Sequence, residues 1–324
     1  MPTVKTIKPA GGGDFTTLAL WEDFADGQSS ADQWAECYTG GNLGSVTLSG
    51  WSSTPDSNDY PKIYAANKEG HGIDFSSGAY ISASTPISVG VPYTRIDGIR
   101  VSGSSNSEKA INFLASGTSR DCRVDNCLVH GTFQYGIFIG QSSTGVSSSN
   151  YVTNNIIVID GSANTTPTAI YAYGTDASGG TTNMFIYHNS IYVRDQGTLN
   201  NFGIRFANVA SCTLNITVEN NIVIGAVDSG GSSITFCYSQ IAFHTGTKTF
   251  NYNVSSDSSA DDFGGTNHQL QERAQNVFAD AESNIFSLAK NSVVLDFGKT
   301  IADVTSDILG TSRPQGDAYD IGAV

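Results

Sequence analysis

A short phrase of strand-forming residues returns five times through the middle of the chain. Each copy starts with Asn or Asp and carries apolar residues two and four positions later, and consecutive copies begin 28 to 35 residues apart. A repeat of this length is typical of a solenoid, in which each repeat packs only on its neighbours. The copies are Asp97-Gly98-Ile99-Arg100-Val101, Asp125-Asn126-Cys127-Leu128-Val129, Asn154-Asn155-Ile156-Ile157-Val158, Asn189-Ser190-Ile191-Tyr192-Val193 and Asn220-Asn221-Ile222-Val223-Ile224.

The phrase has the two-residue period of a β-strand rather than the period of a helix. Its leading Asn or Asp suits a tight bend, because these residues tolerate the left-handed backbone conformation. We therefore expect Asn154, Asn189 and Asn220 to occupy equivalent bends and to bond backbone groups of adjacent coils. We expect seven apolar residues to point inward and to stack from coil to coil: Ile99, Ile156, Val158, Ile191, Val193, Ile222 and Ile224.

A second short strand follows each phrase, at Ile111-Asn112-Phe113, Ile137-Phe138-Ile139, Ile170-Tyr171-Ala172, Ile204-Arg205-Phe206 and Ile234-Thr235-Phe236. No segment between these strands has a sustained helical pattern of apolar residues, which excludes a β-α-β crossover. Parallel strands without helices between them can pair only with their own copies one turn later. The sequence therefore predicts an all-β chain that folds as a single-stranded parallel β-helix.

The composition agrees with this architecture. Charged residues make up 14% of the chain, against about 25% in an ordinary soluble domain. Side chains of a β-helix stack over their counterparts in the next coil, about 4.8 Å away, where like charges repel. The longest apolar runs have four or five residues, far fewer than the roughly 20 that span a bilayer, so we expect no membrane insertion.

Both ends of the chain have the features of caps. Residues 16–25 predict a short helix with Leu18, Trp21 and Ala25 on one face, and such a helix would cover the open end of the solenoid. Near the other end, a turn at Arg313-Pro314-Gln315-Gly316 precedes a predicted last strand at 319–324. We predict one domain, 1–324, with an N-terminal cap and first coils at 1–64, regular coils at 65–255, and a polar excursion with C-terminal closing coils at 256–324.

The ladder of repeat phrases resembles right-handed parallel β-helix proteins of the pectin-lyase-like class. The segment Gly12-Gly13-Asp14-Phe15-Thr16-Thr17-Leu18 resembles the entry of pectinesterase-type β-helices. The longer opening is similar to β-helix proteins of tailed phages and prophages, through Ala35-Glu36-Cys37-Tyr38 and Val46-Thr47-Leu48-Ser49-Gly50-Trp51. The ending also occurs in bacterial and phage β-helices, through Arg313-Pro314 and Tyr319-Asp320-Ile321-Gly322-Ala323. The resemblance implies a right-handed β-helix and leaves the function open, because this fold carries lyases, hydrolases, esterases, adhesins and virion parts.

The start of the chain lacks the apolar core and the small-residue cleavage site of a secretory signal. The five cysteines are an odd number without metal-site spacing, and Cys127 fills the Ile position of its phrase. We therefore expect small, reduced core cysteines. These features favour synthesis in a host cytoplasm, without a signal peptide, and a final location in a phage virion.

The charge balance disfavours an enzyme of the pectin type. With 16 Lys and Arg against 30 Asp and Glu, the net charge is −14, which would repel a polyanionic polysaccharide or a nucleic acid unless a local basic groove existed. The catalytic segment of pectinesterases, of Gly-Asp-Val-Asp-Phe type, has no match in this chain. None of that family's catalytic residues therefore transfers to this sequence.

Arg95 and Asp97 recur one repeat later as Arg123 and Asp125. If the repeats align, the two carboxylates stack on adjacent coils about 5 Å apart, which is the separation in a retaining glycosidase. A structural interpretation is favoured over a catalytic one, since Asp can replace Asn at a bend and each Arg can neutralise a neighbouring carboxylate in an exposed pair. The face on which Arg95 and Arg123 lie is also open.

Three further carboxylates, Asp257, Asp261 and Asp262, lie in a Ser- and Gly-rich stretch, which favours a solvated loop without a metal; a Ca2+ site is the weaker alternative. We predict no cofactor. Five tyrosines lie in or beside strands, where they either face outward to contact glycans or proteins or stack in the core: Tyr135, Tyr171, Tyr173, Tyr187 and Tyr192.

The sequence favours a structural protein of a tailed-phage virion, namely a head decoration, head-fibre or tail-fibre subunit for rigid display and attachment. Binding of host-surface polysaccharide is an added expectation. The alternative is a polysaccharide-degrading β-helix enzyme, either a tailspike depolymerase or a lyase, and a secreted adhesin would need a signal peptide. As partners we expect other virion proteins and further copies of this chain in a homotrimer, held by polar and aromatic side chains of one strand face.

Overall fold

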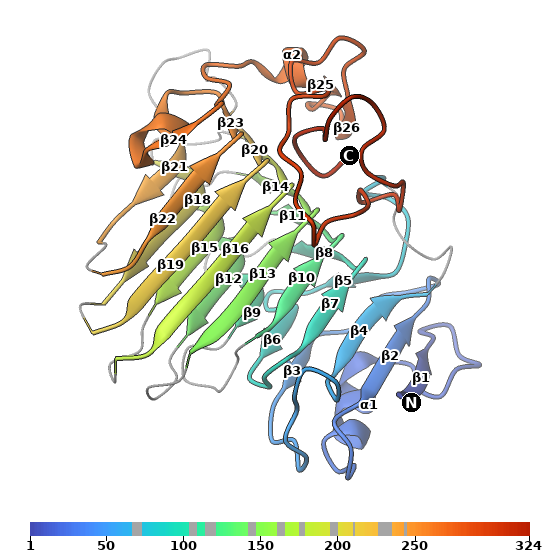
Figure 1. Ribbon diagram of the computed structural model, residues 1–324. Coiled ribbons are helices and arrows are strands. Elements are labelled where there is room, and N and C mark those ends of the chain that lie inside the picture. Colours follow the sequence, from blue (N-terminus) through green and yellow to red (C-terminus); the bar gives the residue numbers. More distant parts are fainter. Residues whose placement is uncertain are drawn as a thin grey trace.

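The computed structural model of the chain describes residues 1–66, 73–103, 109–113, 121–141, 147–160, 166–174, 179–194, 200–209, 211–225, 235–242 and 245–324 (Figure 1). These residues form a solenoid of parallel strands, arranged in three sheets that run side by side along its axis. The all-β fold class and the parallel β-helix are thereby confirmed. The division into one domain with three parts stays a prediction.

Sheet A has ten strands, in the order β1 (Thr3–Ile7), β2 (Gln33–Cys37), β4 (Lys62–Ala65), β7 (Arg95–Asp97), β10 (Arg123–Asp125), β13 (Ser148–Thr153), β16 (Thr181–Tyr187), β19 (Thr213–Glu219), β22 (Lys248–Asn251) and β24 (Gly265–Thr266). Sheet B has seven, namely β5 (Tyr80–Ser82), β8 (Arg100–Gly103), β11 (Leu128–Gly131), β14 (Ile156–Asp160), β17 (Ser190–Arg194), β20 (Ile222–Gly225) and β23 (Val254–Ser255). Sheet C also has seven, namely β3 (Val46–Leu48), β6 (Ile87–Val89), β9 (Lys109–Phe113), β12 (Tyr135–Gln141), β15 (Thr168–Gly174), β18 (Asn201–Asn208) and β21 (Thr235–Gln240). Ile234, the first residue of one predicted strand, lies outside the described residues.

Adjacent strands pair in parallel and in register, so equivalent side chains stack in columns along the solenoid. The inner column of sheet B runs through Val101, Val129, Ile157, Ile191 and Val223, all of them fully buried. Apolar columns of sheets A and C complete this interior core, whose burial is the main source of stability. The five cysteines are buried and unpaired, as expected.

Three of the seven residues expected to point inward belong to the interior core, namely Ile99, Ile191 and Val193. The prediction is wrong for the other four, which lie in a second core on the outer face of sheet B: Ile156, Val158, Ile222 and Ile224. A strand that is buried on both faces has apolar residues at every position. The unbroken run from Ile156 to Ile159 is such a strand, and its inward residues are Ile157 and Ile159.

The outer face of sheet B is covered by the C-terminal segment, residues 274–324, which Figure 1 draws in orange to red. The segment begins with α2 (Ala274–Val277) and an antiparallel pair, β25 (Phe278–Asp280) and β26 (Ile285–Leu288). The expected last strand at 319–324 is wrong, because residues 319–324 form no strand. An apolar outer face needs cover, and this segment supplies it with Val277, Phe278, Phe286, Ile308 and Ile321.

A buried column of asparagines lies at the turn into sheet B, at Asn155, Asn189, Asn221 and Asn253. The Asn155 N–H donates to Asn189 Oδ1, and the Asn189 N–H donates to Asn221 Oδ1, each at 3.0 Å. The predicted ladder is therefore right for Asn189. Its partners in the column are Asn155 and Asn221, each one residue after the predicted Asn154 and Asn220. Asn154 and Asn220 occupy the preceding column, where φ is 55° and 58°. His188, with φ 53°, takes the equivalent place in the coil between them.

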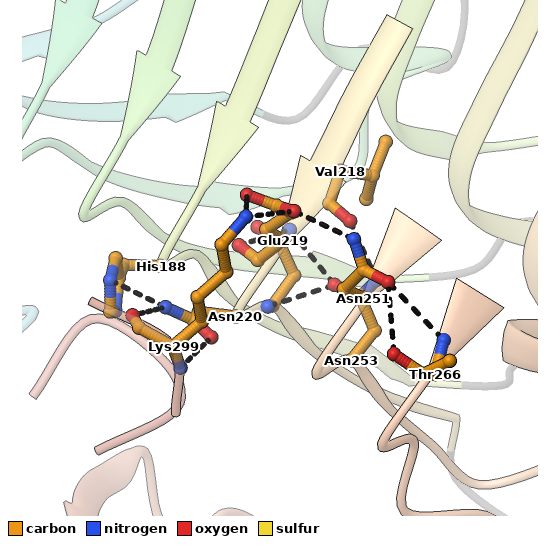
Figure 2. A network of polar contacts seen from close by, with 9 residues as sticks. His188, Val218, Glu219, Asn220, Asn251, Asn253, Thr266 and Lys299 are labelled. Carbon is orange, nitrogen blue, oxygen red and sulfur yellow. Dashed lines mark hydrogen bonds and ion pairs between the residues drawn. The ribbon is translucent and has the colours of Figure 1, made fainter. Parts of the chain in front are cut away.

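Asn154 and Asn220, the two asparagines of this bend column, form hydrogen bonds with the C-terminal segment. Asn154 Nδ2 donates to the Ser306 carbonyl at 2.8 Å. The Lys299 N–H donates to Asn220 Oδ1 at 2.9 Å, and Asn220 Nδ2 donates to the Lys299 carbonyl at 2.6 Å (Figure 2). Lys299 also forms an ion pair with Glu219 at 2.8 Å. The bend column thus serves both the local backbone conformation and the attachment of a distant segment.

Each end of the interior core is closed by a helical turn. The predicted cap is confirmed as α1 (Leu18–Ala25), whose Leu18, Trp21 and Ala25 are buried. At the other end, the 3-10 helix η1 (Ser259–Phe263) places Phe263 within 5.0 Å, ring centre to ring centre, of Phe206 and Phe250. In the part of the chain that the structure describes, no helix is long and apolar enough to cross a membrane.

Candidate functional site

Two columns of side chains run along the outer face of sheet A and are largely half-buried. We call them together the sheet A wall. The first column contains Trp34, Lys62, Arg95, Arg123, Tyr151 and Phe185. The second contains Glu36, Tyr64, Asp97, Asp125, Thr153 and Tyr187. Successive members of a column lie on neighbouring strands, about 4.8 Å apart.

The strand sequences account for this arrangement. In β7, the apolar Ile96 lies between Arg95 and Asp97, and in β10 Val124 lies between Arg123 and Asp125. Because successive side chains of a strand point to opposite faces, the apolar residue enters the interior core and both charged neighbours face outward. The position of Arg95 and Arg123, which the sequence left open, is therefore on the wall.

Three cations follow one another in the first column, which like-charge repulsion alone would disfavour. Aromatic rings lie beside them: the Arg123 guanidinium is 4.2 Å from the ring centre of Tyr151, and that of Arg95 is 5.0 Å from the ring centre of Tyr60. Burial lowers the pKa of Arg95, and the charge of Arg123 lowers it further. Cation–π contacts and the adjacent carboxylate column offset this cost. A local basic strip therefore exists in an acidic chain.

Asp97 and Asp125 lie opposite each other on β7 and β10, as their repeat spacing predicted. Asp97 is ion-paired, with its Oδ2 3.0 Å from Lys62 Nζ. Its Oδ1 accepts a hydrogen bond from Asn126 Nδ2 at 2.9 Å. Both oxygens of Asp97 are therefore engaged by neighbouring donors.

Asp125 has a different environment. Burial raises the pKa of Asp125 to about 7, and the negative charge of Asp97 adds to the shift. Arg123 and the Thr153 hydroxyl lower this pKa, by less than burial raises it. Near neutral pH the wall therefore carries an ion-paired carboxylate next to a carboxyl group that is partly protonated.

The C-terminal segment turns this part of the wall into a groove of about 170 Å3. Residues 303–306 form one side, and the wall residues Asp97, Asp125, Tyr151 and Tyr187 line the other. Tyr187 packs on Val304, which fixes the segment against the wall. The volume is small beside the roughly 300–1,000 Å3 of pockets that enclose drug-sized ligands. It suits one sugar-sized group of a longer ligand that lies along the wall.

The four residues singled out from the sequence, Arg95, Asp97, Arg123 and Asp125, are thus brought together. Sequence reasoning missed the rest of the site. The repeat spacing could have predicted Tyr151 as a member of this column, because Tyr151 follows Arg123 by 28 residues, the spacing that separates Arg95 from Arg123. Residues 303–306 follow no repeat and gave no signal.

Among the three candidate metal ligands, Asp257 has a structural role, because its carboxylate accepts hydrogen bonds from neighbouring residues. Asp257 Oδ1 accepts hydrogen bonds from the Ser259 N–H at 2.9 Å and from its hydroxyl at 2.6 Å, and Oδ2 accepts one from the Cys237 N–H at 3.1 Å. Asp261 and Asp262 are exposed on η1. Among the described residues, no three His, Cys, Asp or Glu side chains are grouped to hold a metal ion. The solvated loop, favoured over a Ca2+ site, stays a prediction.

The five tyrosines noted in the sequence all lie outside the interior core. On sheet C, Tyr171 stacks with Tyr135 at 5.2 Å and with Tyr173 at 5.6 Å between ring centres. Tyr192 is buried beneath the C-terminal segment. Tyr171 and Tyr187 are 9% and 8% exposed, whereas Tyr135 and Tyr173 are half-buried, as are the rings in the first column of the sheet A wall.

Comparisons with known proteins place the chain in no family. No protein-family model matches the chain, and no curated protein matches it. Among solved structures the chain is similar to pectate lyase Pel9A, with 11% sequence identity and a TM-score of 0.39, over 93% of this chain and 90% of that one. The parallel β-helix itself follows from the strand pairing described above.

Proposed function

We propose that this protein is a structural subunit of a tailed-phage particle that binds host-surface polysaccharide along the sheet A wall. The observation that carries the binding role is the pair of columns in which aromatic rings, cations and carboxylates repeat at the strand spacing. A polysaccharide also repeats, so each rung can offer similar contacts to the next sugar.

The residue types of the wall suit sugars. Aromatic side chains pack against the apolar faces of pyranose rings, and Trp34, Tyr151 and Phe185 are half-buried on the wall, where each leaves part of its ring exposed. Hydroxyl groups both donate and accept hydrogen bonds, and Arg123 and Asp97 offer groups of both kinds. A rigid wall binds without the entropic cost of ordering loops.

The virion role draws on the resemblance of the opening and ending of the chain to phage β-helices. A long β-helix is a stiff spacer, which suits display and attachment. Other virion proteins are the expected partners, and a homotrimer about a common axis would repeat the wall three times and raise avidity.

The binding role is tested on an array of purified bacterial capsular polysaccharides and O-antigen chains. We expect the wild-type protein to bind a member of the array and Tyr151→Ala to weaken binding about 10-fold, equivalent to about 1.4 kcal/mol. Tyr173→Ala, on sheet C, is the matched control and should bind as the wild type does. Equal loss in both variants, or binding to no polysaccharide, would contradict the role of the wall.

The virion role is tested by mass spectrometry of purified particles from a strain that carries the gene. We expect the protein at a stoichiometry set by particle symmetry, and absence from the particles would reject the role. Light scattering tests the trimer. A mass near the 34.1 kDa of one chain would show that trimers do not form free in solution.

A further inference from the structure

We propose that Asp97 and Asp125 are the nucleophile and the general acid of a retaining glycoside hydrolase site, which cuts the polysaccharide that lies along the sheet A wall. This inference rests on the glycan-binding role proposed above and adds a reaction to it. The substrate class is an O-glycosidic bond of a bacterial surface polysaccharide, and the co-reactant is water.

The separation of the two carboxyl groups is the first support. Asp97 and Asp125 are direct register partners on parallel strands β7 and β10 and face the same side. Strand spacing puts such side chains about 4.8 Å apart. Retaining glycosidases hold their two carboxyl groups about 5–5.5 Å apart, whereas inverting enzymes need about 6.5–9.5 Å to admit a water molecule. The geometry therefore predicts retention.

The second support is that the two environments differ in the way that the reaction needs. Lys62 Nζ forms an ion pair with Asp97 Oδ2 at 3.0 Å, and Asn126 Nδ2 donates to Asp97 Oδ1 at 2.9 Å. Asp125 has no such ion pair at hydrogen-bond distance among the described residues, and its raised pKa leaves it able to donate a proton near neutral pH. Pairs of carboxyl groups whose environments separate their protonation states are the usual assignment of acid and nucleophile.

The third support is the groove. Residues 303–306 enclose the carboxyl pair on one side and bring a third acid, Asp303, into the lining of the groove. Asn154 lines the same groove and is 5% exposed. Its Nδ2 bonds Ser306, but its Oδ1 is buried without a partner in the described structure. Buried polar atoms seldom stay unpaired, and a sugar hydroxyl that enters the groove can supply the missing donor after a small shift of the segment.

The reaction has two balanced steps. In the first, Asp125 gives its proton to the glycosidic oxygen as the bond from that oxygen to the anomeric carbon breaks, and an oxygen of Asp97 bonds to that carbon. The leaving chain departs as an alcohol. In the second step, water attacks the anomeric carbon, Asp125 takes its proton, and the ester to Asp97 breaks. One water molecule is consumed, and both carboxyl groups return to their starting forms.

The test measures reducing ends released from the same panel of capsular polysaccharides and O-antigen chains. We expect release by the wild type, with retained anomeric configuration by NMR, and a fall with rising pH near 7, where Asp125 loses its proton. Asp125→Asn should lower the rate about 10²–10⁴-fold. Asp160→Asn, which removes an acid paired with Arg194 at 3.2 Å on sheet B, is the matched control and should keep full activity.

A second variant, at Asp97, tests the nucleophile independently of the result for Asp125→Asn. Asp97→Gly should be inactive in water, and added azide should restore cleavage and yield a glycosyl azide of inverted configuration. Melting temperatures of all variants check that each is folded.

The outcomes separate the two proposals. A polysaccharide that binds the wild type and is never cut overturns the hydrolase and leaves the binding role intact. Cleavage that survives Asp125→Asn, or inversion of the anomeric centre, also overturns the assignment. A protein that neither binds nor cuts any member of the panel overturns both proposals.

Discussion

The outer faces of sheets A and B belong to the same coils and differ in what covers them. Apolar residues dominate the outer columns of sheet B from β14 to β20, and residues 274–324 bury them. The outer columns of sheet A carry rings and charges, and in the described structure the C-terminal segment reaches over part of them with residues 299–306. In a β-helix the interior is uniform, so the outward residue of each strand decides which wall is covered by the chain and which stays available to a ligand.

The largest expected difference comes from large-to-small changes on the two walls. Phe286 is fully buried and lies 5.1 Å from Phe278 and 6.1 Å from Tyr192 between ring centres. Phe286→Ala should lower the free energy of unfolding by about 3–5 kcal/mol. Phe185→Ala, on the sheet A wall, should cost only about 1 kcal/mol, because Phe185 is half-buried and its ring contacts, with Tyr151 and Tyr187, lie at the surface. Equal losses in chemical denaturation would break the comparison.

The asparagine column should show the next largest effect. Asn189→Ala leaves the buried N–H of Asn155 without its acceptor and removes the bond from Asn189 Nδ2 to the Val152 carbonyl at 2.9 Å. A buried group left unpaired costs about 1–3 kcal/mol. Asn183→Ala, on the outer face of sheet A, is the matched control and should change stability by less than about 0.5 kcal/mol. An unchanged free energy of unfolding in Asn189→Ala would show that the asparagine column does not stabilise the fold.

A smaller effect is expected where the C-terminal segment is fastened. Lys299→Met removes the ion pair with the buried Glu219, which keeps a hydrogen bond from Asn251 Nδ2 at 2.8 Å. Because Lys299 is half exposed, we expect a loss of about 1 kcal/mol. Hydrogen exchange should report faster opening of residues 299–306 with sheet A unchanged. Lys290→Met, on an exposed turn, is the control, and a similar change in it would contradict a specific fastening.

The smallest expected effect concerns pH. The folded-state pKa of Asp125 lies near 7, above the unfolded value of about 3.9. The folded state therefore holds this proton more tightly between these values, and its stabilising contribution is lost as pH rises through 7. Asp125→Asn should remove this decline and make the protein relatively more stable at pH 8 than the wild type. Parallel pH profiles of melting temperature for both proteins would contradict the assigned environment of Asp125.

These regions also differ in how far the sequence predicted them. The strand period and the pairing of Asp97 with Asp125 followed from local spacing, because register in a β-helix repeats the sequence. The register was wrong by one residue for the copies that begin at Asn154 and Asn220, because Thr153 is the strand partner of Asp125. His188, not Asn189, takes the bend position equivalent to Asn154 and Asn220. The cover of sheet B and the side of the groove at 303–306 depend on contacts across more than 100 residues, such as Asn154 with Ser306. No periodic pattern encodes such contacts.

Hydroxyl-radical footprinting with mass spectrometry tests the central claim most directly, because it compares both walls in one experiment. In the free protein, Trp34, Tyr151 and Phe185 on sheet A should be oxidised, and Tyr192 and Phe286 beneath the C-terminal segment should be protected. Addition of a polysaccharide that binds in the array should protect the sheet A rings and leave the sheet C ring Tyr173 unchanged. Protection confined to another face, or rapid oxidation of Phe286 in the folded free protein, would contradict the account.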